Sequence, residues 1–328
     1  MSYDVSFIIP CYNEASYVVN CIASIRQQEI DPAVYEIIVV DNGSIDGTEE
    51  IAASLGAKVL INPRRGAAAS RNFGASFAKG HMLAFVDADC ILDSKWFITL
   101  AAHFLSPQVC AVAAPAIPVS EGITWVERAW SKVFVCFPRN VLHGVARVTN
   151  LASSNLLIRA EHFKNIGGFD EKLLSCEDYD LSQRLLHHGI LLLDNNILVS
   201  HLRESKTIRE LFNREVARGR YSLRCFKKNG FALGELPSAA IPIIFVCVLL
   251  TSVAIMCIQT KIAILLLSLL LCMPMIYIAR SGMRFETTTG SLQEYIVVAT
   301  YIVARSIAMI KEIYDICTVP WYGTKGVG

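Results

Sequence analysis

Short apolar runs alternate with amphipathic stretches over residues 5 to 86 of the chain. Runs with the length and composition of buried strands cover residues 5–9, 37–40, 58–61 and 82–86. Stretches with apolar side chains at helical spacing cover residues 18–27, 48–55 and 67–78. Because strands that alternate with helices form parallel βαβ units, the pattern predicts an α/β fold with a doubly wound sheet.

Longer apolar stretches follow in the C-terminal third. The composition is 53% hydrophobic, more apolar than that of an ordinary soluble protein. Residues 239–258 and 262–279 each approach the length needed to cross a bilayer as a helix, which is about 20 residues. Only the polar residues 259–261 separate them, so the pattern predicts a membrane hairpin. The alternative is a buried helical hairpin in a soluble core.

A third apolar stretch, residues 295–310, contains Arg305. An arginine at the centre of a membrane helix costs about 2.5–3.5 kcal/mol on insertion scales. This stretch therefore either spans the bilayer or lies in its interface. The sequence alone does not decide between the two.

Basic residues are concentrated beside the predicted spans, although the formal net charge is only +1. Those before the first span are Arg209, Arg214, Arg218, Arg220, Arg224, Lys227 and Lys228, and those after the second are Arg280 and Arg284. The turn between the spans carries one lysine. Because basic loops stay inside, we expect a multi-pass inner or plasma membrane protein with its N-terminal part in the cytoplasm. This placement gives no case for nucleic acid as a partner.

The N-terminus and the cysteines agree with a cytoplasmic location. Residues 1–4 lack a basic region, and the apolar run at 7–9 is too short for a secretion signal. The chain has 11 cysteines, an odd number, with no Cys-x-x-Cys pair. We therefore expect reduced thiols, without a zinc site built on such pairs.

Two acidic residues, Asp87 and Asp89, follow the apolar run at 82–86 and flank Ala88. The period of two along a strand places both carboxylates on one face at its C-terminal end, where open α/β sheets bind ligands. Hard oxygen ligands suit Mg²⁺ or Mn²⁺, which would hold the phosphates of a nucleotide. The alternative is an acidic turn after a strand.

Other polar residues lie at the ends of neighbouring strands. Tyr12, Asn13 and Glu14 follow the first strand, Asp41 ends the second, and Arg71 lies in the third helix. We expect them to converge on one crevice, although each alone could be a turn, cap or surface residue. No Gly-x-Gly-x-x-Gly follows the first strand and no phosphate-binding P-loop motif occurs, so dinucleotide oxidoreductases and P-loop NTPases are poorly supported.

These motifs, taken together, resemble family 2 glycosyltransferases with the GT-A fold. Segments similar to the donor-binding motifs of that family are residues 7–14, 40–48, 70–75 and 87–89. Residues 155–159 and 167–171 are similar to its acceptor-side segment, and Glu177-Asp178 to its catalytic acidic pair. The resemblance covers roughly residues 5 to 220, and chance agreement of all the pieces in order is very small.

The resemblance implies a nucleotide-diphospho-sugar transferase fold with a Rossmann-like mixed sheet, and sugar transfer with inversion. Asp178 would be the base, with Glu177 beside it. The implied donor-binding residues, for a UDP- or GDP-linked sugar, are Pro10, Tyr12, Asn13, Glu14, Asp41, Arg71, Asp87 and Ala88. The implied acceptor-side residues are Asn155, Gly168 and Phe169. Asp87 and Asp89 would hold the metal.

His201 follows the apolar run at 197–199 and is a further candidate metal ligand. Some GT-A enzymes use a histidine at this place, and the alternative is a histidine at the end of a strand. We therefore include His201 with Asp87 and Asp89 in the predicted metal site.

The predicted domains are a catalytic domain over 1–205, a basic interfacial helical segment over 206–236 and a membrane region over 237–328. The basic segment either rests on anionic headgroups or presents arginines to a lipid-linked phosphate. Both favour a lipid-linked or membrane-proximal acceptor. Residues 213–215 and 219–221 depart from the Gln-x-x-Arg-Trp motif of processive synthases, which favours one transfer per encounter.

Two other classes remain as alternatives. A nucleotidyltransferase would also use a nucleotide crevice and paired acids, but should have a glycine-rich phosphate loop where residues 10–14 stand. A non-enzymatic membrane scaffold would not need two acidic sites. We expect a membrane-anchored, metal-dependent inverting glycosyltransferase that acts at the cytosolic membrane face, with its sugar and acceptor undetermined.

Overall fold

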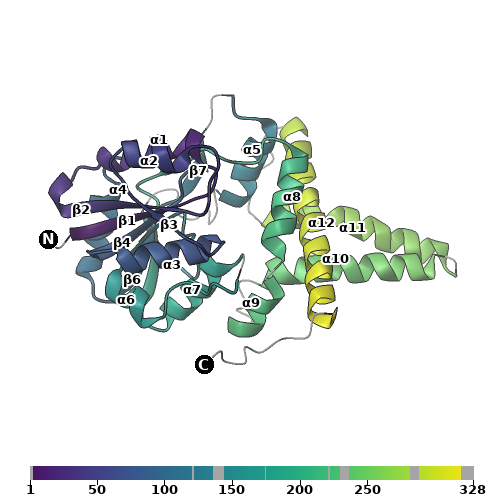
Figure 1. The fold of residues 1–328 in the computed structure, drawn as a ribbon. Helices are drawn as coiled ribbons and strands as arrows, with labels where there is room; N and C mark the ends of the chain where they lie inside the picture. The colour runs from purple at the N-terminus through teal and green to yellow at the C-terminus, as the bar shows by residue number, and fades with distance from the viewer. Residues whose placement is uncertain are drawn as a thin grey trace. The chain divides into compact units, whose positions relative to one another are not determined.

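The computed structural model divides into two compact units (Figure 1). The first unit comprises Met1–Ile123 and Pro138–Glu204, and the second comprises Thr124–Phe137 and Ser205–Gly328. The described residues are 3–119, 122–135, 144–173, 175–220, 222–229, 236–256, 258–280 and 288–318. The boundaries proposed from the sequence at residues 205 and 236 stay a prediction.

An eight-stranded mixed sheet forms the centre of the first unit. Its strands, in spatial order, are β3 (Lys58–Ile61), β2 (Tyr35–Asp41), β1 (Tyr3–Cys11), β4 (Gly80–Val86), β9 (Asn155–Arg159), β6 (Val109–Ala113), β10 (Ile190–Asp194) and β8 (Val145–Val148). The four strands predicted from the N-terminal pattern are β1 to β4, and they pair in parallel. β9 then pairs antiparallel with both β4 and β6. The sheet is therefore mixed, as the family resemblance implies.

Helices cover both faces of this sheet because side chains alternate along each strand. On β1, Phe7 and Ile9 belong to one buried cluster, whereas Ile8 belongs to the other. The helices that contribute to the first cluster are α1 (Ala15–Arg26), α2 (Thr48–Ser54) and α4 (Trp96–Ala102). Those of the second are α3 (Ala67–Phe77), α6 (Ala160–Asn165) and α7 (Glu177–Leu186). Figure 1 shows the sheet between these two layers.

A small second sheet lies in the same unit. It contains β5 (Cys90–Leu92), β11 (Val199–His201) and β7 (Ala116–Pro118), with β11 in the middle. Short helical turns occur at η1 (Pro32–Val34) and η2 (His103–Leu105). Because β5 begins directly after Asp89, the small sheet joins the acidic triplet to His201.

The regular secondary structure described in the second unit is helical. Its elements are α5 (Trp125–Trp130), η3 (Ser131–Val135), α8 (Ile208–Gly219), α9 (Ser222–Asn229), α10 (Leu236–Ile255), α11 (Thr260–Arg280) and α12 (Thr288–Thr318). The predicted spans fall in α10 and α11. Among the described residues, one segment, Thr260–Ala279, is long and apolar enough to cross a membrane, and Ile241–Ile255 is a shorter apolar helix. One such helix also fits a soluble core, so the membrane hairpin stays a prediction.

The third apolar stretch lies inside α12. Arg305 Nε and Nη2 lie 3.0 and 2.9 Å from Glu215 Oε2 of α8. Glu215 is fully buried, and Leu211 beside it packs in a cluster with Val298 and Ile302 of α12. The charge that made this stretch ambiguous is therefore compensated by a carboxylate of the same unit.

Gly74 allows α3 to approach the sheet, and Gly74→Ala should destabilise the protein. An added Cβ would lie 2.6 Å from Ile8 Cγ2 and 2.8 Å from Val40 Cγ2. Helix propensity alone would favour alanine by about 1 kcal/mol, but overpacking against two β-branched side chains costs about 1–3 kcal/mol. Urea unfolding should show a net loss of stability. Ser76→Ala, an exposed change on the same helix, should stay within about 0.5 kcal/mol of wild type, and a stabilised Gly74→Ala would contradict the packing argument.

Candidate active site

A cavity of about 220 Å³ lies beside the C-terminal ends of β1 and β4. It is lined by Pro10, Cys11, Tyr12, Glu14, Asn42, Ala67, Ser70, Arg71, Asp87, Ala88 and Asp89. Six of the eight predicted donor-binding residues are in this set, together with Asp89. The parallel strands bring them together because residues that end neighbouring strands meet at one edge of the sheet.

The other two predicted donor-binding residues, Asn13 and Asp41, are not among the lining residues. The Asp41 carboxylate is buried and accepts hydrogen bonds from Gly43 N and Ser44 N, both at 2.9 Å. Asn13 has a left-handed backbone with φ of +55°, and its Oδ1 accepts from Ile45 N at 3.0 Å. Asp41 thus shapes the turn after β2, and Asn13 links that turn to the one that carries Tyr12 and Glu14. Direct contact of Asp41 and Asn13 with a donor stays a prediction.

Arg71 connects the cavity to the acidic pair. Its Nη2 lies 2.7 Å from Asp87 Oδ1, and its Nη1 lies 3.1 Å from Glu177 Oε1. The side chain is only 5% exposed, and its guanidinium lies 5.4 Å from the centre of the Phe169 ring. Burial alone would lower the pKa of Arg71, but Asp87, Asp178 and Glu177 outweigh it and raise the pKa. Arg71 is therefore charged and fixed between the two acidic sites.

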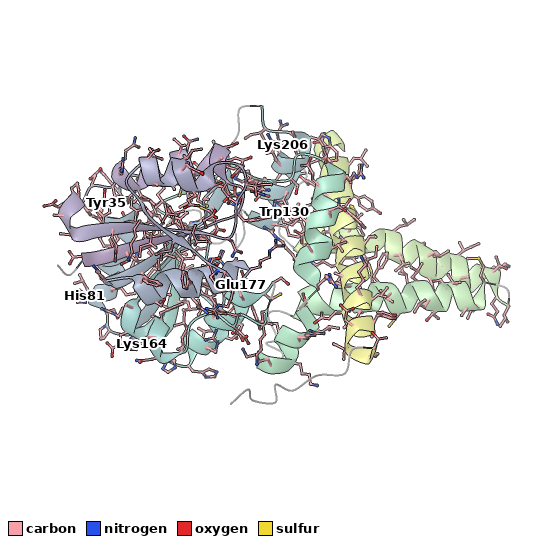
Figure 2. All side chains as sticks on the ribbon, viewed as in Figure 1. Tyr35, His81, Trp130, Lys164, Glu177 and Lys206 are labelled. Carbon is pink, nitrogen blue, oxygen red and sulfur yellow. The ribbon has the colours of Figure 1, made fainter. Side chains whose placement is uncertain are left out.

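Glu177 and Asp178 are the first two residues of helix α7 (Glu177 is labelled in Figure 2). Cys176 precedes them with a left-handed φ of +65°. Asp178 Oδ1 is buried without a hydrogen-bond partner among the described residues. Desolvation and the neighbouring Glu177 raise the pKa of Asp178 to about 6, although Arg71 opposes the shift. A carboxylate with this pKa is ionised at neutral pH and basic enough to accept a proton.

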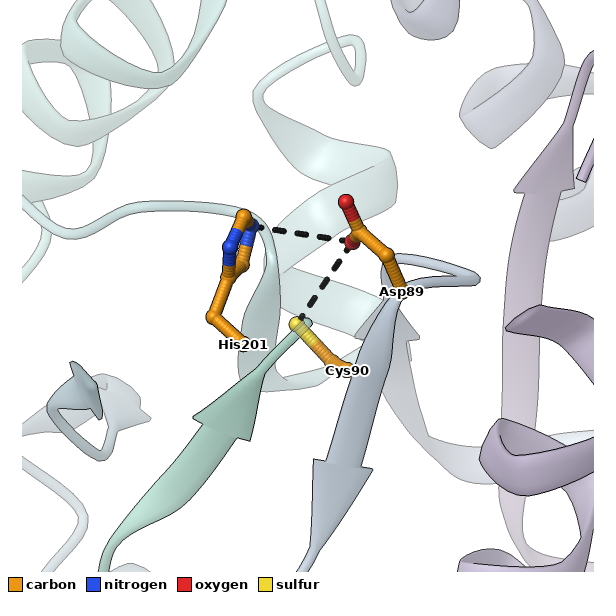
Figure 3. A group of neighbouring side chains, drawn as sticks. All are labelled: Asp89, Cys90 and His201. Atoms are coloured by element: carbon orange, nitrogen blue, oxygen red, sulfur yellow. Dashed lines mark hydrogen bonds and ion pairs between the residues drawn. The ribbon is translucent and has the colours of Figure 1, made fainter. Parts of the chain in front are cut away.

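Asp89, Cys90 and His201 form a group of potential metal ligands (Figure 3). Asp89 Oδ1 lies 3.6 Å from His201 Nε2 and 4.0 Å from Cys90 Sγ. Carboxylate oxygen and imidazole nitrogen fit Mn²⁺ and tolerate Mg²⁺, so Asp89 and His201 fit the predicted metal site. Asp87 is outside this group and bound to Arg71, and its role as a metal ligand stays a prediction.

The predicted acceptor-side residues are mostly internal. Asn155 is buried, and its Oδ1 accepts from Trp96 Nε1 at 3.3 Å and from Ala114 N at 2.8 Å. Gly168 has φ of +71°, and Phe169 is buried beside Phe85. The Phe169 ring also lies against the Arg71 guanidinium. Contact of the three residues with an acceptor stays a prediction.

Two contacts made by residues that follow β11 were not predicted. Arg203 Nη1 lies 2.7 Å from Glu14 Oε1, and His201 Nδ1 lies 3.5 Å from Glu204 Oε1. Burial raises the pKa of Glu14 to about 7, with Asp89 and Asp87 adding to the shift and Arg203 opposing it. The only signal for them in the sequence was their position, because Arg203 and Glu204 lie two and three residues after the predicted ligand His201.

Residues 6–167 match the sequence profile of Glycosyl transferase family 2. This part of the chain is therefore similar to a family 2 glycosyltransferase domain, and the mixed sheet is that of the GT-A fold. Among solved structures, the mannosyltransferase PcManGT from Pyrobaculum calidifontis, in complex with GDP-Man and Mn²⁺, aligns with a TM-score of 0.62 at 18% identity. The alignment covers 96% of this chain and 88% of that one. At this identity the likeness establishes the fold.

Two curated relatives carry glycosyltransferase names. The chain is 31% identical over 193 residues to glycosyltransferase AglE of Haloferax volcanii, covering 56% of this chain and 62% of that protein. It is 30% identical over 206 residues to the pre-mycofactocin glycosyltransferase of Mycobacterium tuberculosis, covering 60% of this chain and 42% of that protein. The chain thus spans less than two thirds of the length of either relative.

Asp178→Asn should leave the protein as stable as wild type, or more stable, at pH 7. The raised pKa means that the ionised carboxylate destabilises the fold at pH above about 6, a penalty that the amide lacks. We expect a gain of up to about 3 kcal/mol that disappears toward pH 4, where both side chains are neutral. Urea unfolding at several pH values measures it.

Asp180→Asn is the matched control on the same helix. The Asp180 carboxylate is fully buried and lies 2.7 Å from Arg184 Nη2, so its neutralisation should destabilise the protein by about 3–5 kcal/mol. A loss above about 1 kcal/mol at pH 7 for Asp178→Asn would contradict the assigned environment of Asp178.

Proposed function

We propose that this chain is a metal-dependent inverting glycosyltransferase that moves a sugar from a UDP- or GDP-linked donor to an acceptor hydroxyl. The observation that carries the proposal is that Arg71 forms ion pairs with both Asp87 and Glu177. These two contacts connect the proposed donor cavity to the acidic residues that begin α7. A nucleotide site and a base are thereby held at fixed separation, which is what an in-line displacement requires. The mannosyltransferase of similar fold, whose complex contains GDP-Man and Mn²⁺, supports the donor class and the metal.

In this proposal, Asp178 accepts the proton of the acceptor hydroxyl as its oxygen attacks the anomeric carbon. The new bond joins that oxygen to the carbon, and the bond from the carbon to the phosphate oxygen breaks, so the nucleoside diphosphate leaves with the electron pair. Asp89 and His201 would hold the divalent ion, which when bound neutralises charge on the diphosphate. Arg71 holds Asp87 and Glu177 through its ion pairs. Its charge also limits the rise in the pKa of Asp178, which is therefore ionised at neutral pH.

The acceptor we propose is lipid-linked, used at the cytosolic membrane face. The support is the apolar character of Thr260–Ala279, of which 22% is buried, and its outward side chains such as Leu265, Leu269 and Ile276. An apolar helix of this length, exposed along its side, is stable in hydrocarbon and unfavourable in water. On this proposal α10 and α11 anchor a multi-pass inner or plasma membrane protein.

The direct test is sugar transfer by the full chain in detergent or membranes, with a panel of UDP- and GDP-sugars and Mn²⁺. Labelled product should partition into the organic phase if the acceptor is a lipid. Asp178→Asn and Asp89→Ala should each lower kcat by about 10²–10⁴-fold, because a base and a charge-stabilising site are removed. Ser76→Ala is the control on the surface of the same unit. Full turnover by either folded variant would contradict its assigned role.

The pH profile of kcat gives a second test. Since Asp178 must be ionised, kcat should fall about tenfold per pH unit below pH 6, the approximate pKa of this group. Glu177 raises that pKa by repulsion, so Glu177→Gln should move the acidic limb of the profile to lower pH. An acidic limb that stays in place in Glu177→Gln, or moves upward, would show that another group limits the rate.

A further inference from the structure

The side chains of Cys90 and His201 meet because their strands are in register. β5 and β11 pair antiparallel, with Cys90 directly opposite His201, so the two side chains lie on the same face of the small sheet. Leu202 N donates to Asp89 O at 2.8 Å, which extends the pairing past the end of the strand. Asp89 is thereby held beside this cross-strand pair (Figure 3).

The resulting triangle of ligand atoms has the size of a metal site. Asp89 Oδ1, Cys90 Sγ and a His201 ring nitrogen all lie within 4.8 Å of one another, with edges of 3.6 and 4.0 Å from the oxygen. Ligand atoms around a tetrahedral ion with bonds of about 2.0–2.3 Å are about 3.3–3.8 Å apart. A small movement of side chains would bring all three atoms to bonding distance of one ion.

The chemistry of this set differs from that of a hard-ion site. Mg²⁺ and Mn²⁺ prefer oxygen ligands, whereas thiolate and imidazole together favour Zn²⁺ and related thiophilic ions. We propose that Asp89, Cys90 and His201 form a second metal-binding mode, specific for a thiophilic divalent cation of the Zn²⁺ class. On binding, the metal–sulfur bond forms and the thiol proton passes to solvent.

This mode would inhibit sugar transfer, a consequence that rests on the proposed function. Three protein ligands leave a tetrahedral ion one open position, whereas an octahedral ion held by Asp89 and His201 keeps several. An ion with one open position cannot bind two phosphate oxygens of the donor together. Zn²⁺ should therefore compete with Mn²⁺ and leave the enzyme inactive.

Co²⁺ provides a test that does not depend on activity. The metal-stripped full chain is titrated with Co²⁺, and a sulfur-to-cobalt charge-transfer band is followed in the near ultraviolet. Wild type should show the band, and Cys90→Ala should lose it. Cys110→Ala is the matched control, because Cys110 is an equally buried thiol outside the group and should leave the band intact. Cys90→Ser, which preserves the side-chain size, is the second variant if the alanine variant fails to fold.

Inhibition gives the second readout. The Zn²⁺ concentration that halves Mn²⁺-supported transfer should rise at least tenfold in Cys90→Ser and stay unchanged in Cys110→Ala, each relative to its own activity without Zn²⁺. A wild type without the band, or a band of equal intensity in Cys90→Ser, would overturn the proposal. A band that depends on Cys90 in a chain that transfers no sugar would instead uphold the site and refute the proposed function.

Discussion

The buried guanidinium of Arg71 is the interaction on which the candidate site depends. It is surrounded by three carboxylates, of which Asp87 and Glu177 bind it directly, and it lies over the Phe169 ring. A buried arginine without partners would be strongly destabilising, and so would two carboxylates brought together without a cation. Neither acidic site could hold this geometry alone. The fold therefore joins the cavity to the acidic pair through the charge of Arg71.

Hydrogen bonds between the turns after β1 and β2 fix the backbone on this side of the candidate site. Glu14 N donates to Thr48 Oγ1 at 2.9 Å, and Ala15 N donates to Asp46 Oδ2 at 3.0 Å. The segment from Asp41 to Thr48 thus fixes the backbone of the first turn, on which Tyr12 and Glu14 are mounted. Because these contacts are local to the ends of β1 and β2, the pocket wall needs no ligand to be formed.

The sequence predicted what depends on local pattern and could not predict what depends on register. The strand expected at residues 82–86 is β4 (Gly80–Val86), and the helix expected at 67–78 is α3 (Ala67–Phe77), because periodicity and flanking residues specify such elements. The insertion of β9 beside β4 pairs Asn155 with Val86, 69 positions apart, and no local signal marks it. The sequence therefore located whole motifs more reliably than it predicted where each side chain points.

Asp41 illustrates why single residues within a motif were harder. From sequence, a carboxylate at a strand end is equally suited to a ligand or to the backbone of its own turn. In the structure, the Asp41 carboxylate accepts hydrogen bonds from Gly43 N and Ser44 N, whereas Asn42 lines the cavity. The choice is made by backbone geometry after β2, which composition does not encode. His201 is the opposite case. The sequence offered it as a single candidate ligand, and the register of its strand places it beside Asp89.

Compensated charges also change the argument for membrane association. Counted from sequence, each basic residue near an anionic surface contributes roughly 1 kcal/mol. In the structure, Arg220 Nη2 lies 3.1 Å from Asp315 Oδ2, and Arg218 Nη1 lies 3.5 Å from Glu215 Oε1. Charges paired within the protein attract headgroups less than the count suggests. If the chain is anchored in a membrane as proposed, the apolar side chains of α11 would supply most of the affinity, and binding would depend only weakly on salt.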